Sequence, residues 1–164
     1  MSKIETERLT LRLWKEKDFD LFAKYYSDEK NAKYVGGRKT IDEAWRHFAL
    51  QIGHWELKGF GYWAVDEKES DCFVGCVGLW QSAGWPELEL GYWLLNEYQG
   101  KGYAREASIA SREFAQNILG AKSLVSYIDP TNMPSIKLAE SLGAKYEETI
   151  KYGADPDNAF FCII

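Results

Sequence analysis

Two glycines in a short turn are the residues whose type and spacing point most directly to chemistry. Gly100 and Gly102 follow an apolar stretch that ends at Leu95, and helical character begins at Ala104. Amides at a helix N-terminus have no partner within the helix, and the helix dipole is positive there. Glycine lets such a turn close around an anion. The segment therefore predicts a phosphate-binding turn, and the alternative is a strand-to-helix connection that binds nothing.

Two common phosphate-binding patterns do not fit this turn. A P-loop would need Gly-Lys-Ser/Thr at the right spacing, and the sequence does not supply it. The dinucleotide pattern GxGxxG would need a glycine where Arg105 stands. The turn must therefore be explained by another class of phosphate-bearing ligand, if it binds one.

The turn and its surroundings resemble the GNAT superfamily of N-acetyltransferases. Residues 99–104, Gln-Gly-Lys-Gly-Tyr-Ala, are similar to the family signature Gln/Arg-x-x-Gly-x-Gly/Ala. The blocks TERLTLRLW, GYWLLNEYQGKGYAREA and NMPSIKLAESLGA look like the branch that includes the RimJ/RimL ribosomal-protein N-terminal acetyltransferases. The resemblance covers nearly the whole chain. It implies one acetyltransferase domain over residues 1–164, which moves an acetyl group from acetyl-coenzyme A (acetyl-CoA) to a primary amine by direct attack.

The resemblance also assigns residues to the cosubstrate. In that family the amides of this turn hold the pyrophosphate, and amides of the preceding strand face the acetyl carbonyl where two strands splay. Asn132 would bond the pantetheine arm, or it would only shape its own loop. Lys101 and Lys137 would reach the phosphates of the cosubstrate. Otherwise Lys101 is a turn residue and Lys137 a solvated helix residue. Arg105 and Glu106 are interpreted as charge partners and packing. The implied contacts with acetyl-CoA are Trp93, Leu94, Leu95, Gln99, Gly100, Lys101, Gly102, Tyr103, Ala104, Asn132 and Lys137.

Acetyl transfer also needs a base for the amine and a donor for the leaving thiolate. Glu89 matches the position where several family members carry a catalytic Glu; a structural carboxylate is the alternative, and Glu87 lies two residues away on the same face. Many members use a Tyr for the thiolate, but Ala139 occupies that position. Ser135 matches the Asn-x-x-Ser pattern of the RimJ/RimL branch, and its hydroxyl would donate to sulfur or cap a helix.

Two other functions stay open. One is an acetyltransferase for a small molecule such as a polyamine, an amino acid or a drug, because residues 152–164 lack the basic, glycine-rich hairpin expected of the ribosomal-protein branch. The other is an acyl-CoA-binding module without turnover, which the missing Tyr favours. An open acceptor groove would indicate a peptide terminus, and a closed one a small amine.

Hydrophobic patterns predict the elements that must position these residues. Apolar and polar residues alternate over residues 9–14, which is typical of a half-buried strand. Thr40 and Glu43 form a capping box that opens an amphipathic helix over residues 40–57. Short turns between strands imply an antiparallel meander. The remaining predicted strands are 60–67, 72–80, 87–95, 123–128, 144–148 and 160–164, and the remaining helices are 18–26, 104–119 and 135–142.

The predicted order is β-α-α-β-β-β-α-β-α-β-β. It indicates an α/β (α+β) fold with a mixed, mostly antiparallel central sheet and helices on both faces.

Composition and charge limit the partners, the cellular location and the metal binding that we expect. The 164 residues carry a net charge of −5 and no Lys/Arg run, so nucleic acid is not an expected partner. No apolar stretch reaches the roughly 18 residues that span a bilayer, and the charged N-terminus is not a signal peptide, which favours the cytoplasm. His47 and His54 lack a third ligand in sequence, so we expect no metal. Cys72, Cys76 and Cys162 are expected to be reduced core residues. A homodimer is possible, since dimers are common among related proteins.

Overall fold

A computed structural model describes residues 3–150 and 158–162, and within them the strands form one eight-stranded sheet. The strands lie in the order β1-β2-β3-β4-β5-β6-β8-β7. All neighbours pair antiparallel except β5 and β6, which run parallel. The predicted mixed, mostly antiparallel sheet is confirmed. The strands are β1 (Ile4–Glu5), β2 (Leu9–Arg12), β3 (Tyr62–Glu67), β4 (Cys72–Trp80), β5 (Glu89–Leu94), β6 (Val125–Ile128), β7 (Lys145–Ile150) and β8 (Asn158–Cys162).

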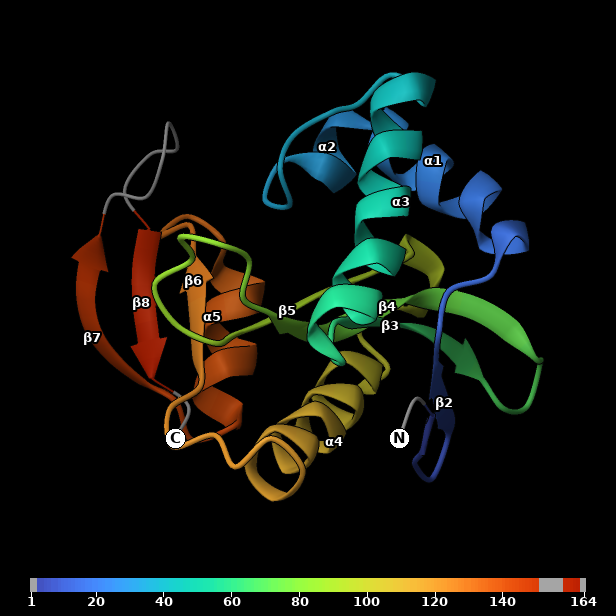
Figure 1. Cartoon of the computed structure of the whole chain (residues 1–164). Coiled ribbons are helices and arrows are strands. Elements are labelled where there is room, and N and C mark those ends of the chain that lie inside the picture. Colours follow the sequence, from blue (N-terminus) through green and yellow to red (C-terminus); the bar gives the residue numbers. More distant parts are fainter. Residues whose placement is uncertain (1–2, 151–157, 163–164) are drawn as a thin grey trace.

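Helices cover both faces of this sheet (Figure 1). The first three lie over one face and α4 lies against the other, with α5 beside α4 and β6. Short 3₁₀ turns precede α1 and follow β5. None of the described helices combines the length and the apolar character that a membrane crossing requires. The helices are α1 (Phe19–Ser27), α2 (Glu29–Ala32), α3 (Ile41–Lys58), α4 (Tyr103–Asn117) and α5 (Met133–Ser141).

The predicted order of elements is confirmed, with two short additions. The two-residue β1 and the four-residue α2 are too short to carry a hydrophobic period that sequence could reveal. Residues 163–164 of the last predicted strand lie outside the described residues.

The capping box at the start of α3 is present. The Glu43 amide donates to Thr40 Oγ1 at 3.3 Å, and the Thr40 amide donates to Glu43 Oε2 at 2.8 Å. Gly59 ends the helix with φ of 73°, in the left-handed region that suits glycine. These local signals set both ends of the longest helix without help from the sheet.

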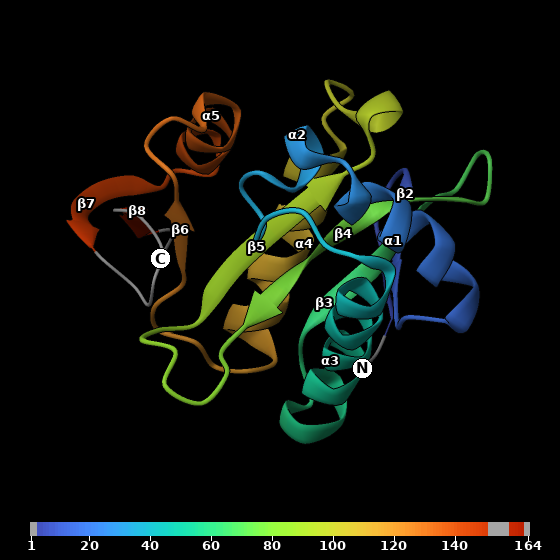
Figure 2. The same ribbon diagram turned by 90° about the horizontal axis from the view of Figure 1, so that it is seen from above.

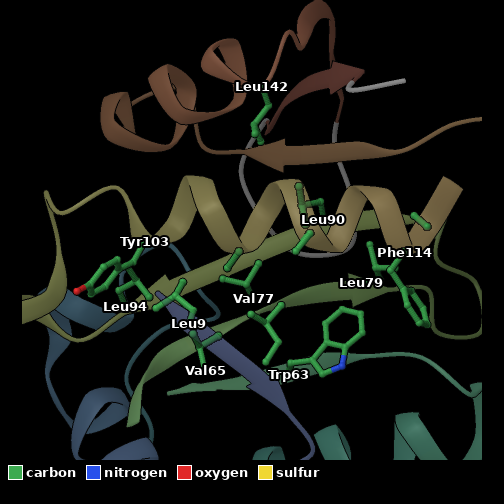
Figure 3. Close-up of a cluster of buried hydrophobic side chains, with 14 of the residues drawn as sticks. Leu9, Trp63, Val65, Val77, Leu79, Leu90, Leu94, Tyr103, Phe114 and Leu142 are labelled. Carbon is green, nitrogen blue, oxygen red and sulfur yellow. The ribbon is translucent and has the colours of Figure 1, made fainter. Parts of the chain in front are cut away.

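Alternation along the strands divides the core between the two faces. Leu90 and Leu94 of β5 belong to the buried cluster under α4, which Figure 3 shows. Trp93 belongs to the cluster under α1 and α3. Because successive side chains of a strand point to opposite faces, Glu89 shares the face of Trp93. The strand that precedes the glycine turn thus presents different residues to each side of the sheet.

A buried ion network ties the start of α1 to the sheet. Arg12 Nη1 and Nη2 donate to the Asp18 carboxylate at 2.7 and 2.8 Å, and Arg12 Nε and Nη2 donate to Asp66 at 2.5 and 2.8 Å. All three residues are buried. The two carboxylates share one guanidinium, so removal of the arginine would leave both without their cation.

Replacing Arg12 by Leu should lower the free energy of unfolding by about 3–5 kcal/mol, because it leaves buried carboxylates uncompensated. Urea denaturation of the parent and the variant measures the difference. Arg46→Leu is the matched control: Arg46 pairs with Asp42 at the surface, where such pairs contribute about 0–1 kcal/mol. Equal unfolding free energies for the parent and Arg12→Leu would contradict the importance of this network.

The cysteine prediction is partly wrong. Cys76 is buried as expected, but Cys72 is exposed, because it begins β4 directly after the turn that joins the strand to β3. The side chain of Cys162 lies outside the described residues.

Candidate active site

The expected separation of two neighbouring strands occurs between β5 and β6. Their only register pair among the described residues is Glu89 with Val125, and the Val125 amide donates to Leu88 O at 3.0 Å. Beyond this point the strands diverge toward α5 (Figure 2). One edge of β5 therefore faces open space instead of another strand.

The direction of the β5 amides follows from the ladder. The Leu90 carbonyl accepts from Ser126 Oγ at 2.6 Å, so it faces β6. Backbone groups alternate in direction along a strand, so the backbone amides and carbonyls of Tyr92 and Leu94 also point toward β6. The Leu95 amide instead donates to Val74 O of β4 at 2.9 Å. The resemblance implied that the amides of Trp93, Leu94 and Leu95 face the acetyl carbonyl. Of these, the Trp93 and Leu95 amides are directed to β4, and only the Leu94 amide is directed into the gap between β5 and β6. The Tyr92 amide, which was not expected there, also points into this gap.

The glycine turn leaves the first amides of α4 open. Gly100 and Gly102 have φ values of 74° and 81°, and Gly102 is the N-cap residue of α4. No described side chain bonds to the amides at this cap, and a Cβ at Gly100 would meet no atom within 4 Å. This arrangement is that of an anion site at a helix N-terminus. Gln99 shapes the turn, since its Nε2 donates to Leu94 O at 3.0 Å.

A hydrogen-bond network holds this turn against the N-terminal strands. Glu106 accepts from Thr6 Oγ1 at 2.6 Å, from the Arg8 amide at 2.8 Å and from Arg8 Nε at 2.7 Å. Arg8 Nη1 also donates to Lys101 O, inside the turn, at 2.9 Å. The interpretation of Glu106 as a charge partner is confirmed. Arg8, which the sequence did not single out, fixes the backbone between the two glycines.

A cavity of about 390 Å³ opens beside the turn, between β5, α4 and α5. Lys101 and Lys137 do not line it, and Lys101 Nζ lies 4.9 Å from the centre of the Tyr98 ring. Arg105, interpreted from the sequence as a charge partner and packing residue, does line it. The residues from the sequence prediction that line this cavity are Trp93, Leu94, Gln99, Gly100, Gly102, Tyr103, Ala104, Asn132 and Ser135.

The start of α5 brings Ser135 into the same cavity. Asn132 is the N-cap residue, and its Oδ1 accepts from the Ser135 amide at 3.4 Å. The alternative role of Ser135 as the helix cap is therefore wrong, because Asn132 fills that position. The Tyr92 hydroxyl donates to Ser135 O at 3.1 Å and links β5 to α5. Burial raises the pKa of Tyr92 to about 12, so this hydroxyl stays protonated.

A second cavity, of about 320 Å³, lies on the opposite face of β5, under α1 and α3. It shares Tyr92 and Trp93 with the first cavity. Its other lining side chains are mainly rings, together with Glu89, His47 and Gln51. The two cavities therefore meet across one strand, with Glu89 on the side away from the glycine turn.

Glu89 of β5 is the carboxylate that lines this second cavity. Its burial raises its pKa to about 8, and hydrogen bonds from the Tyr127 backbone and the Trp85 side chain offset this only in part. Glu87 lies elsewhere: it accepts from Ser123 Oγ at 3.0 Å and does not line the cavity. A carboxyl with a pKa near 8 can take a proton from an amine close to neutral pH.

The two histidines have different surroundings. His47 lines the second cavity, its Nε2 lies 3.2 Å from the Tyr26 hydroxyl, and burial lowers its pKa to about 4. His54 is held by Phe60 O at 2.8 Å and stacks on Trp80 with 4.0 Å between centroids. Within residues 3–150 and 158–162, no three His, Cys, Asp or Glu residues are grouped as metal ligands.

Comparisons with known proteins agree with this geometry. A family model described as acetyltransferase (GNAT) domain matches residues 8–145. A protein named uncharacterized N-acetyltransferase p20, from Bacillus licheniformis, is 31% identical over 156 residues, which cover 92% of this chain and 86% of that protein. An acetyltransferase structure from Agrobacterium tumefaciens str. C58 is similar with a TM-score of 0.90 at 30% identity, over 99% of this chain and 94% of that one. The ribosomal-protein-S5-alanine acetyltransferase from Vibrio fischeri shares the fold, with a TM-score of 0.77 at 24% identity, over 99% and 96%.

The fold and the matches define an acyltransferase. The chain belongs to the GNAT acetyltransferase family, whose members use acetyl-CoA and act on amines.

Replacing Gly102 by Glu should weaken acetyl-CoA binding by at least about 100-fold, because placing like charges together costs several kcal/mol. Isothermal titration of acetyl-CoA into the parent and the variant measures the change. Gly120→Glu is the control, since Gly120 also has a positive φ, of 66°, but lies beyond the other end of α4; a Cβ at Gly102 would lie 3.4 Å from Arg8 Nη2, whereas one at Gly120 would meet no atom within 4 Å. Unchanged affinity in Gly102→Glu would show that the turn does not hold the phosphates.

Proposed function

We propose that this protein is an N-acetyltransferase of the RimJ/RimL-like branch, acting as a single domain over residues 1–164. It transfers acetyl from acetyl-CoA to a primary amine by direct attack. The observation that carries the proposal is that two cavities on opposite faces of the sheet share Tyr92 and Trp93. A thioester held in one cavity is then within reach of an amine held in the other. The three sequence blocks described above support the branch.

The cosubstrate would lie in the cavity beside α4. The pyrophosphate would rest on the amides of residues 100–104, with Arg105 as an added cation, and Asn132 would line the path of the pantetheine arm. The acetyl carbonyl would face the Leu94 and Tyr92 amides. One such donor is typically worth about 2.7–4 kcal/mol of transition-state stabilisation.

Glu89 would act as the base. It takes a proton from the ammonium group, directly or through water, and the freed nitrogen attacks the thioester carbon. The carbon–sulfur bond then breaks, the thiolate leaves, and the nitrogen loses its second proton. Ser135 would donate a hydrogen bond to the thiolate, which takes up a proton to complete the reaction. The raised pKa of Glu89 suits this role, because a base is most effective when its pKa lies near the working pH.

Replacing Glu89 by Gln should lower kcat by about 10²–10⁴-fold. A base acts only when deprotonated, so kcat/KM of the parent should rise with pH through about 8 and then level off, since the folded pKa is raised to about 8. Thiol release measured from pH 6 to 9.5 tests both effects. In Glu89→Gln this rise should disappear apart from titration of the amine itself. Glu87→Gln is the control, and an equal loss in both variants would contradict the assignment.

Replacing Ser135 by Ala should lower kcat by about 10²-fold while acetyl-CoA affinity stays the same, because the hydroxyl is needed only as the thiolate forms. Steady-state kinetics measures the change in kcat, and isothermal titration measures the affinity for acetyl-CoA. Ser141→Ala is the control: Ser141 lies on the same helix, exposed, with its hydroxyl bonded to Leu138 O at 2.7 Å. Full activity in Ser135→Ala would remove Ser135 from the mechanism.

The small-molecule alternative is favoured by one observation. The cavity that holds Glu89 is walled by rings from α1, α3 and the sheet, which suits a compact acceptor better than a charged peptide. The alternative of a binding module without turnover is based on the missing Tyr at Ala139. Tyr92 and Ser135 both supply hydroxyls beside the gap between β5 and β6, so the missing Tyr does not by itself favour that alternative.

A further inference from the structure

The walls of the cavity that holds Glu89 define a chemical class of acceptor. Most of its lining residues carry rings, among them Phe22, Tyr26, Tyr62, Trp80, Trp85 and Trp93. Rings pack against other rings in offset or edge-to-face contacts that stabilise the pair beyond the effect of the area buried. A flat apolar body is therefore the shape these walls bind best.

Charge in this cavity limits the number of cations that it can hold. Glu89 is its only lining carboxylate among the described residues, and burial raises its pKa to about 8. His47 is neutral there, since its pKa is lowered to about 4. The amine that reacts has one carboxyl to meet, and a second ammonium group would have none.

Gln51 adds a polar requirement. This residue of α3 lines the cavity and is 5% exposed, and its Oε1 has no hydrogen-bond partner among the described residues. Its neighbours on the buried face of the helix include the apolar Phe48. An unpaired buried polar atom is costly, so a ligand donor that reaches the Gln51 side-chain amide from the cavity would gain a favourable hydrogen bond.

We propose that the acceptor is a small arylalkylamine: its primary amine stands on a short alkyl chain, and its aromatic ring also bears a hydroxyl or N–H group that donates to the Gln51 side-chain amide. This proposal rests on the acetyl transfer proposed above. The ring lies among the aromatic walls, the amine meets Glu89 on β5, and the polar substituent meets Gln51 on α3. The volume of about 320 Å³ is at the small end of ligand pockets and suits a single ring with a short side chain.

The test compares acceptors that differ in one feature. Thiol release from acetyl-CoA is measured with tyramine, phenylethylamine, n-butylamine, spermidine and a short peptide with an N-terminal serine. The ring amines should exceed n-butylamine in kcat/KM by at least about tenfold, and tyramine should exceed phenylethylamine. A higher kcat/KM for spermidine or the peptide would overturn the proposal.

A variant isolates the polar contact. Gln51→Met keeps the shape of the side chain and removes the acceptor, and an apolar side chain at a buried, unpaired position is not expected to prevent folding. Its kcat/KM should fall about tenfold for tyramine and stay within about twofold for phenylethylamine. Gln116→Met, exposed on α4, should change neither. An equal change with both amines would mean that Gln51 only packs, which contradicts its role.

Failure of this inference is distinguishable from failure of the proposed function. If acetyl-CoA binds and n-butylamine or the peptide is acetylated best, the transferase activity stands and the acceptor class is wrong. If the parent neither binds acetyl-CoA nor acetylates any of these amines, the proposed function fails and the inference fails with it.

Discussion

The site depends on β5 being paired fully on one edge and hardly at all on the other. Strand β4 occupies one edge through a continuous register, whereas β6 meets β5 only at Glu89 and Val125. Backbone amides that would otherwise join a ladder then face a cavity, and side chains still alternate between the two faces of the sheet. One strand thereby supplies main-chain donors to the gap, Glu89 to one cavity and Leu94 to the other. No loop has to be placed accurately to bring these groups together.

The glycine turn connects this strand to α4 and leaves the first amides of that helix without side-chain partners among the described residues. The first amides of α4 are available because Gly102 caps the helix without a side chain. Their position is held from outside the turn, by Arg8 on Lys101 O and on Glu106. A turn with two glycines would be loose by itself, since glycine has the largest conformational freedom to lose. The N-terminal segment supplies the restraint, through contacts between residues that lie 93 and 98 positions apart in the sequence.

Burial sets the electrostatics on the other face. Burial beside the rings that line the second cavity makes the charged form of Glu89 costly and raises its pKa to about 8. On the same face, burial lowers the pKa of His47 to about 4, and Gln51 Oε1 has no hydrogen-bond partner within the part of the chain that the structure describes. The apolar walls of this cavity and the raised pKa of its carboxyl are therefore two consequences of one packing arrangement. The ordered start of α1, held by Arg12 on Asp18, supports the helix wall that creates it.

Local signals in the sequence determined the elements and marked the glycine turn as a feature of interest, and the resemblance to a family linked that turn to acetyl-CoA. The capping box at Thr40, the strand alternation and the spacing of Gly100 and Gly102 act over a few residues, so each can be recognised without the fold. Tertiary structure alone decided which strand edge opens, and hence that Leu94 and Tyr92 rather than Trp93 and Leu95 direct amides into the gap. It also decided that Arg105 lines the cavity while Lys101 lies over Tyr98, and that Glu89 rather than Glu87 is enclosed by rings. These outcomes depend on contacts between segments far apart in the chain, whose burial and direction no local pattern encodes.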